Sequence, residues 1–133
     1  MPASRRQFTA EKTAKVMEDW PANWAGDDED VPAGRGLVAI LRPFITDLHA
    51  QGLSDGTIRR HLDNLWLIGG EVIREVNDRP SLRRKEPRVL LLAAIQDGQA
   101  PLVHDLTEQE QASVDATARK LLKFLAPSNP TLP

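Results

Sequence analysis

The sequence predicts an all-α fold of four or five helices. Apolar residues recur at intervals of three and four along most of the chain, which is the spacing on the buried face of a helix, and the alternation typical of strands hardly occurs. Proline and glycine separate these periodic segments, as they do between helices. A chain of 133 residues with 41% hydrophobic content can build one core, so we expect one small bundle.

Composition limits the partners of the protein. The 17 Lys and Arg residues against 19 Asp and Glu residues give a net charge of −2, so contact with nucleic acid requires a local basic patch. The chain has no cysteine, which removes disulfides and cysteine-ligated metals and favours a reducing, cytoplasmic compartment. It contains no run of about 18 apolar residues, so we expect no membrane span.

Residues 1–34 are expected to form a helical arm followed by an acidic loop. A helix is predicted over residues 9–20, with Thr9 as its cap and Pro21 as its end. Residues 25–34 contain proline, glycine and four consecutive acidic residues without an apolar period, which is typical of a loop. The residues expected on the buried stripe of the arm are Val16, Met17, Trp20 and Trp24.

The main domain is expected to span residues 35–126, with two long helices at its centre. The first covers residues 36–50, where Pro43 either kinks the helix or marks its true start. Gly52 ends it. The second covers residues 54–77, and its apolar positions step by three and four without a break.

The middle of this second helix carries adjacent glycines, Gly69 and Gly70. Glycine is unfavourable inside a helix, so we expect a neighbouring helix to pass close to the backbone there. Trp66 and the two tryptophans of the arm lie on apolar stripes, so we expect core packing rather than base stacking.

The remaining helices follow a basic connector, residues 79–88, which two prolines bound. Residues 89–95 are predicted to form a short buried helix, because leucine and alanine dominate there and no partner strand is apparent. The last helix spans residues 107–125 and starts at Thr107, where the spacing of threonine and glutamate matches a capping box. Residues 127–133 are expected to be a loose tail.

Residues 52–65 form the most informative motif, a tight turn that leads into an amphipathic helix with two arginines near its start. Backbone N–H groups and arginines at a helix start can bind phosphates. The same pattern also describes an ordinary capped helix, and both interpretations stay open. Arg59 and Arg60 would share one phosphate-binding surface with the connector if the fold brought them to one side.

The segment Phe44-Ile45-x-x-Leu48-x-x-x-Gly52-Leu53-Ser54-x-x-Thr57-Ile58-x-x-x-Leu62-x-x-Leu65 resembles the N-terminal core-binding domain of tyrosine recombinases and phage integrases. In outline the resemblance covers residues 35–126, and it implies a SAM-like bundle of four helices that clamps DNA while a separate domain performs catalysis. The turn is also similar to that of helix-turn-helix repressors, whose second helix enters the major groove.

The resemblance implies a DNA-binding module without a catalytic centre of its own. The chain contains no tyrosine, so it cannot supply the recombinase nucleophile. A recombinase or another protein would then act as its partner in trans. Expected DNA contacts are Ser54, Thr57, Arg59, Arg60 and His61 from the motif, with Arg83, Arg84, Lys85 and Arg88 from the connector.

No catalytic, metal or cofactor site is expected. The three histidines have no short ligand spacing, and the acidic run at residues 27–30 lacks the alternation and glycine of a calcium loop. No Gly-x-Ser-x-Gly turn occurs. The alternative to double-stranded DNA binding is a protein–protein adaptor or assembly module, in which the long helix or the arm packs on a partner. If the acidic run folded over the basic residues, it would repel phosphates, which suits a regulatory cover or the adaptor equally.

Overall fold

The computed structural model describes residues 8–126 of the chain, and every regular element in that range is helical. This confirms the all-α prediction. The tail at residues 127–133 and the first seven residues of the arm lie outside the described range. The elements are α1 (Ala10–Met17), α2 (Trp20–Trp24), the 3₁₀ helix η1 (Asp28–Asp30), α3 (Val31–Ala50), α4 (Asp55–Asp78), the 3₁₀ helix η2 (Pro80–Arg84), α5 (Pro87–Ile95) and α6 (Glu108–Leu125).

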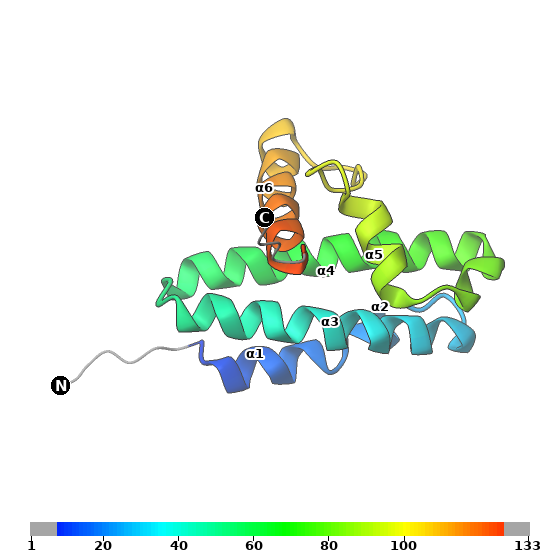
Figure 1. Ribbon diagram of the computed structural model, residues 1–133, viewed down its shortest axis with the longest axis horizontal. Coiled ribbons are helices and arrows are strands. Elements are labelled where there is room, and N and C mark those ends of the chain that lie inside the picture. Colours follow the sequence, from blue (N-terminus) through cyan, green and yellow to red (C-terminus); the bar gives the residue numbers. More distant parts are fainter. Residues whose placement is uncertain (1–7, 127–133) are drawn as a thin grey trace, which may run out of the picture.

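The long helices α3 and α4 form an antiparallel pair along the length of the molecule (Figure 1). They are joined by a tight turn at Gly52, whose φ of 74° lies in the left-handed region that glycine adopts without strain, as the predicted end of the helix requires. On one side α1 and α2 pack on α3, and on the other side α5 and α6 rise away from the pair, with α6 crossing α4 steeply (Figure 1).

One core joins all six α-helices. Met17 of α1, Leu37 of α3, Ile58 of α4, Leu91 of α5 and Leu121 of α6 are each fully buried, and they belong to one apolar cluster. The described part of the arm is therefore packed into the same body as the rest. The expected boundary after residue 34 falls inside α3. Along residues 8–126, none of the helices is both long and apolar enough to cross a membrane.

The helix predicted over residues 9–20 is two helices. Thr9 caps α1 as predicted, since its hydroxyl accepts a hydrogen bond from the Lys12 amide at 3.1 Å. Pro21 does not end a helix, however, but lies in the first turn of α2, where its missing N–H group has no intrahelical partner to lose. Val16, predicted to be buried, is 44% exposed.

The loop predicted over residues 25–34 is wrong in its second half, because α3 already begins at Val31. Pro32 fits the first turn of a helix. The glycines that suggested a loop are instead points of close packing. A Cβ atom at Gly34 would lie 3.0 Å from Pro21 Cα, and one at Gly36 would lie 2.3 Å from Pro87 Cγ. The helix then continues through the exposed Pro43 to Ala50.

The close approach predicted at the glycine pair of α4 is confirmed. A Cβ atom on Gly69 would lie 2.3 Å from Cζ2 of Trp24, so the missing side chain makes room for an indole of α2. The indole Nε1–H of Trp24 donates to the backbone carbonyl of Trp66 at 3.0 Å. Trp66 itself is 43% exposed, so the prediction that it packs in the core is wrong.

The last two helices follow the prediction closely. In α5 the buried side chains are Leu90, Leu91 and Ile95, while Val89 is half exposed. At the start of α6 the capping box is complete, because Thr107 Oγ1 accepts from the Glu110 amide at 3.0 Å and Glu110 accepts from the Thr107 amide at 2.9 Å.

Candidate nucleic-acid interface

The hydroxyl groups at the start of α4 serve the helix cap. Ser54 Oγ accepts a hydrogen bond from the Thr57 amide at 3.2 Å, and its own hydroxyl donates to Thr57 Oγ1 at 3.0 Å. Asp55 adds a carboxylate to the first turn, where the helix dipole favours negative charge. The chemistry of the helix start is therefore that of a capped helix. Any phosphate contact in this region depends on the basic side chains that follow.

Arg59 and Arg60 are both exposed, and they point to different sides of α4. The Arg59 guanidinium lies over the ring of Phe8, 4.2 Å from the ring centroid, which is a cation–π contact. Arg60 lies on the side that faces α6, close enough to influence the ionisation of His61. The two arginines thus widen the positive surface around the start of the helix.

His61 does not lie on the surface, although the motif predicts it there. It is 7% exposed, and its Nδ1 atom lies 2.8 Å from Thr117 Oγ1 of α6, which also accepts a hydrogen bond from Asn64 at 2.9 Å. Burial lowers the pKa of His61 from 6.5 to about 4, with a further contribution from the positive charges of Arg60 and Lys120. His61 is therefore a neutral group of the α4–α6 interface.

Arg83 of the connector is also committed to the fold. Its guanidinium donates to the buried carboxylate of Asp30 at 2.8 and 3.0 Å and to Glu29 at 3.0 Å, and Asp27 lies 3.5 Å away. Burial raises the pKa of Asp30, but hydrogen bonds from Arg83, Asn77 and two backbone amides outweigh burial and bring the pKa below its ordinary value. We call this group the Arg83 cluster. The acidic segment thus folds over a basic residue of the connector.

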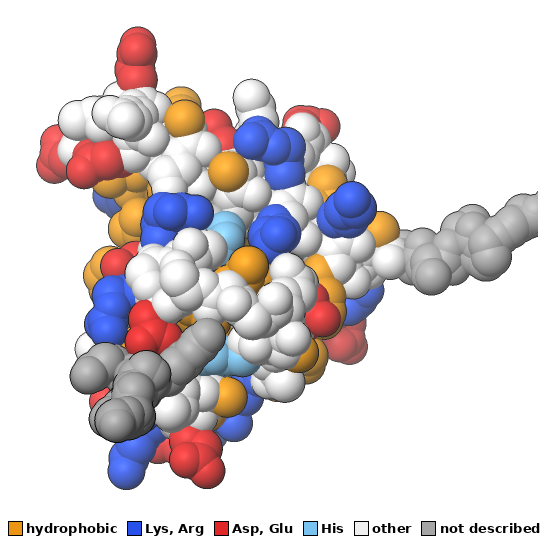
Figure 2. Space-filling model, turned by 90° about the vertical axis from the view of Figure 1, so that its left-hand side faces the viewer, with side chains coloured by type: hydrophobic (Ala, Val, Ile, Leu, Met, Phe, Trp, Pro, Cys, Tyr) orange, Lys and Arg blue, Asp and Glu red, His pale blue; other side chains and the backbone are white. Residues whose placement is uncertain are grey.

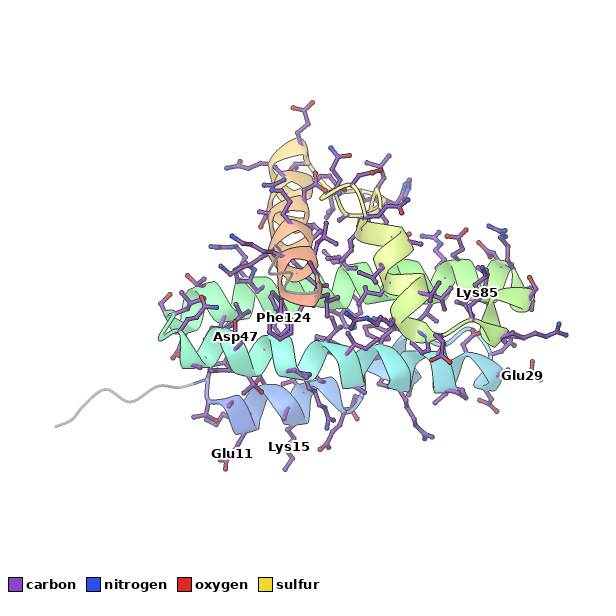
Figure 3. All side chains as sticks on the ribbon, in the orientation of Figure 1. Glu11, Lys15, Glu29, Asp47, Lys85 and Phe124 are labelled. Carbon is purple, nitrogen blue, oxygen red and sulfur yellow. The ribbon has the colours of Figure 1, made fainter. Side chains whose placement is uncertain are left out.

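The other connector residues lie at two separate places, the end of α6 and the far end of α4. Arg88 donates to the carbonyl of Leu125 at 2.8 Å and so satisfies an open carbonyl at the end of α6. Arg84 and Lys85 are exposed. In Figure 3, Lys85 and Glu29 mark the end of the molecule opposite the α3–α4 turn. Because α4 has 24 residues, about 36 Å of helix separates its two ends, so Arg83, Arg84 and Lys85 do not share a surface with Arg59 and Arg60.

The structure adds two lysines of α6 that the sequence interpretation missed. Lys120 of α6 and Arg60 of α4 are both close enough to His61 for their charges to lower its pKa, and Lys123 follows Lys120 one helical turn later. Figure 2 looks along the helix pair at this end and shows Lys and Arg side chains gathered around a histidine. We call the group Arg59, Arg60, Lys120 and Lys123 the basic end.

The charges of the basic end are available to a ligand. Among the described residues, none of its four members forms an ion pair. Nearby negative charge comes from Asp55 and from Asp63, which is exposed one turn after the arginines. Only tertiary contact brings α6 beside α4. The one local hint is that His61 and Asn64 share one face of α4, while Ser113 and Thr117 share one face of α6, as a polar interface between helices requires.

Within residues 8–126, no three His, Cys, Asp or Glu side chains gather in a way that could hold a metal ion. Comparison of the chain with protein-family models, with curated proteins and with solved structures finds no match. The geometry of the chain itself therefore carries the functional argument.

Proposed function

We propose that this protein binds DNA through the phosphate contacts of its basic end. The observation that carries the proposal is that Arg60 of α4 and Lys120 of α6 both lie close to His61, near the exposed Arg59, and that none of these three forms an ion pair with another residue of the range 8–126. Like charges placed together repel one another and cost stability, and an anionic ligand relieves that repulsion. A polyphosphate backbone supplies several negative charges at regular spacing, which suits such a group.

The proposed role is non-catalytic. The resemblance to recombinase core-binding domains, with Arg59 and Arg60 at the start of the long helix, supports a module that holds DNA for a catalytic partner in trans. Ser54 and Thr57 support it indirectly by capping the helix that presents the arginines. In this proposal Lys120 and Lys123 of α6 replace the connector residues as the second group of phosphate contacts.

The test is fluorescence anisotropy of a labelled random-sequence DNA, as duplex and as single strand, at low and physiological salt. The variant Arg60→Gln/Lys120→Gln removes two charges from the basic end. Arg84→Gln/Lys85→Gln removes two exposed charges from the opposite end and is the matched control. We expect the first variant to lose most of the binding and the control to keep it, with circular dichroism unchanged in both.

Two outcomes would overturn this proposal. Equal loss in both variants would show a diffuse charge effect and no interface at the basic end. An absence of binding to either form of DNA at low salt would remove phosphate contact altogether.

The adaptor remains the second candidate, since the structure contains a groove of about 700 Å³ between α4, η2 and α5. Val89 is 50% exposed on the α5 wall, and Val72, Leu82 and Leu90 also line the groove. On the α4 wall Glu75 and its neighbours carry charges of both signs. One apolar and one charged wall match an amphipathic helix of a partner protein.

A photoreactive side chain in place of Val89 tests this groove in cells. We expect it to cross-link one partner repeatedly, while the same side chain at the exposed position Ala112 of α6 should not. Identical cross-linking patterns from both positions would count against a specific groove.

A further inference from the structure

A notch of about 370 Å³ opens between α1 and α4, on the side of α4 that carries Arg59. Trp66 is 43% exposed there, and Val16 is 44% exposed. For a tryptophan in a core-facing pattern this exposure is unusual, because burial of an indole is among the larger apolar contributions to folding. The residues that line the notch are Val16, Trp20, Leu62, Asp63, Trp66 and Leu67.

The backbone that carries Trp66 is held in place independently of its side chain. Its carbonyl oxygen accepts a hydrogen bond from the Trp24 indole, which is itself packed on Gly69 one turn further along. The Trp66 side chain therefore projects from a fixed segment of helix. When a planar ligand binds, only the two side-chain torsions of this indole have to be ordered, which keeps the loss of conformational entropy small.

The notch and the basic end are adjacent on one helix. Trp66 follows Arg59 by seven residues, which is two helical turns, so both side chains lie on the same side of α4, about 10 Å apart along the axis. Arg59 stacks on Phe8, and this contact directs its charge along that side. A strand whose phosphate contacts Arg59 can therefore reach the notch with a neighbouring base.

We propose that the notch receives an unpaired nucleobase stacked on Trp66, and that the DNA bound by this protein is single-stranded at that point. This inference rests on the proposed function and specifies its substrate. The bases of a duplex are stacked on one another, so only an unpaired base has a free face for an indole. Asp63 at the edge of the notch is an acceptor for the exocyclic amino group of a base such as cytosine, and its negative charge turns phosphates away from the notch.

The experiment compares a labelled oligo-dC strand with an abasic strand of the same length, which has the same phosphates and no bases. We expect the wild-type protein to bind oligo-dC roughly five- to 150-fold more tightly than the abasic strand. Trp66→Leu should remove this preference without changing affinity for the abasic strand, and Trp66→Phe should restore part of it. Thermal unfolding of each variant checks that the fold is intact.

The outcomes separate the two proposals. Failure to bind either strand while the duplex is bound would overturn the single-stranded substrate and leave the proposed function standing, and failure to bind the duplex as well would overturn DNA binding itself. Equal affinity for both strands in the wild type would leave phosphate binding intact and overturn the stacking site. If Trp66→Leu instead lowered the mass of the protein in sedimentation and left the strand preference unchanged, the notch would be a contact between copies of the chain.

Discussion

The neutral imidazole of His61 shows how a residue expected on the surface became part of the interior. It is in contact with Thr117, which also accepts from Asn64, while Asn64 donates to Ser113 as well at 3.1 Å. Satisfied polar groups of this kind cost little when buried and fix the register of the two helices that carry them. A protonated His61 would place a charge between helices beside Arg60 and Lys120.

Stability should therefore fall as the pH is lowered from about 6.5 toward 4. Because the pKa of His61 is about 4 in the folded state and 6.5 is its ordinary value, the unfolded chain binds more protons across that interval, and protonation favours unfolding. Urea denaturation at a series of pH values measures the effect. His61→Asn keeps an acceptor near the Nδ1 position and should have a shallower pH dependence than the wild type.

His104 provides the control for this prediction. It is 84% exposed, and its Nε2 lies 3.5 Å from the carboxylate of Asp105. His104→Asn should retain the pH dependence of the wild type between pH 6.5 and 4. A His61→Asn curve parallel to that of the wild type would show that other groups cause the loss of stability.

At the scale of single elements, the missing side chain of Gly69 is a specific requirement of the α2–α4 contact. In Gly69→Ala the new Cβ would overlap the Trp24 ring, since the two atoms would be 2.3 Å apart, and the indole would have to move. Overpacking of this kind costs about 1–3 kcal/mol. We expect a lower free energy of unfolding by that amount in chemical denaturation.

Gly56→Ala is the matched control in the same helix. A Cβ atom at Gly56 meets nothing within 4 Å, so this change should be neutral or should stabilise the helix by up to about 1 kcal/mol. Similar destabilisation by both substitutions would mean that the backbone of α4, rather than the indole contact, is sensitive to alanine.

Helix starts were predictable where the signal is local. Thr9, Ser54 and Thr107 each cap the helix that follows, because a cap needs only the hydroxyl and an amide three residues later. The start of α3 was not predictable in this way. Its glycines resemble loop residues in the sequence, and only the positions of Pro21 and Pro87 show why they occur inside a helix.

In the candidate site, too, the features that depend on local sequence were predictable and those that depend on tertiary packing were not. Exposure of Arg59 and Arg60 follows from their place on an amphipathic helix and was predictable. Burial of His61 depends on where α6 packs, which no local pattern specifies. The same packing brings in Lys120, and the Arg83 cluster joins residues 53 positions apart. Exposure of Trp66 likewise depends on how far α1 extends over α4.

At the scale of the whole molecule, the protein has a net charge of −2, so any attraction to DNA must come from a local group of basic side chains such as the basic end. Association with DNA should therefore depend strongly on orientation and on salt. With up to four basic side chains in contact, the slope of log K against log salt concentration should lie between about −2 and −4. Anisotropy titrations at several salt concentrations give this slope.

The salt slopes of the two charge variants show which side chains contribute to it. Arg60→Gln/Lys120→Gln should bring the slope closer to zero by about 1 to 2, because two fewer counterions are released. Arg84→Gln/Lys85→Gln should leave it unchanged. A slope near zero in the wild-type protein would contradict a binding mode based on phosphates.

The Arg83 cluster has a mechanical consequence for the long helix pair. At one end α3 and α4 are joined covalently through the turn at Gly52, and at the other end the ion pair between Asp30 and Arg83 links the residue before α3 to η2 after α4. Because the helix pair is joined at both ends, α3 and α4 cannot separate at one end while they stay together at the other. If DNA is held at the basic end, a force on the DNA would be transmitted along the α3–α4 pair, over about 36 Å, to the far end of the molecule.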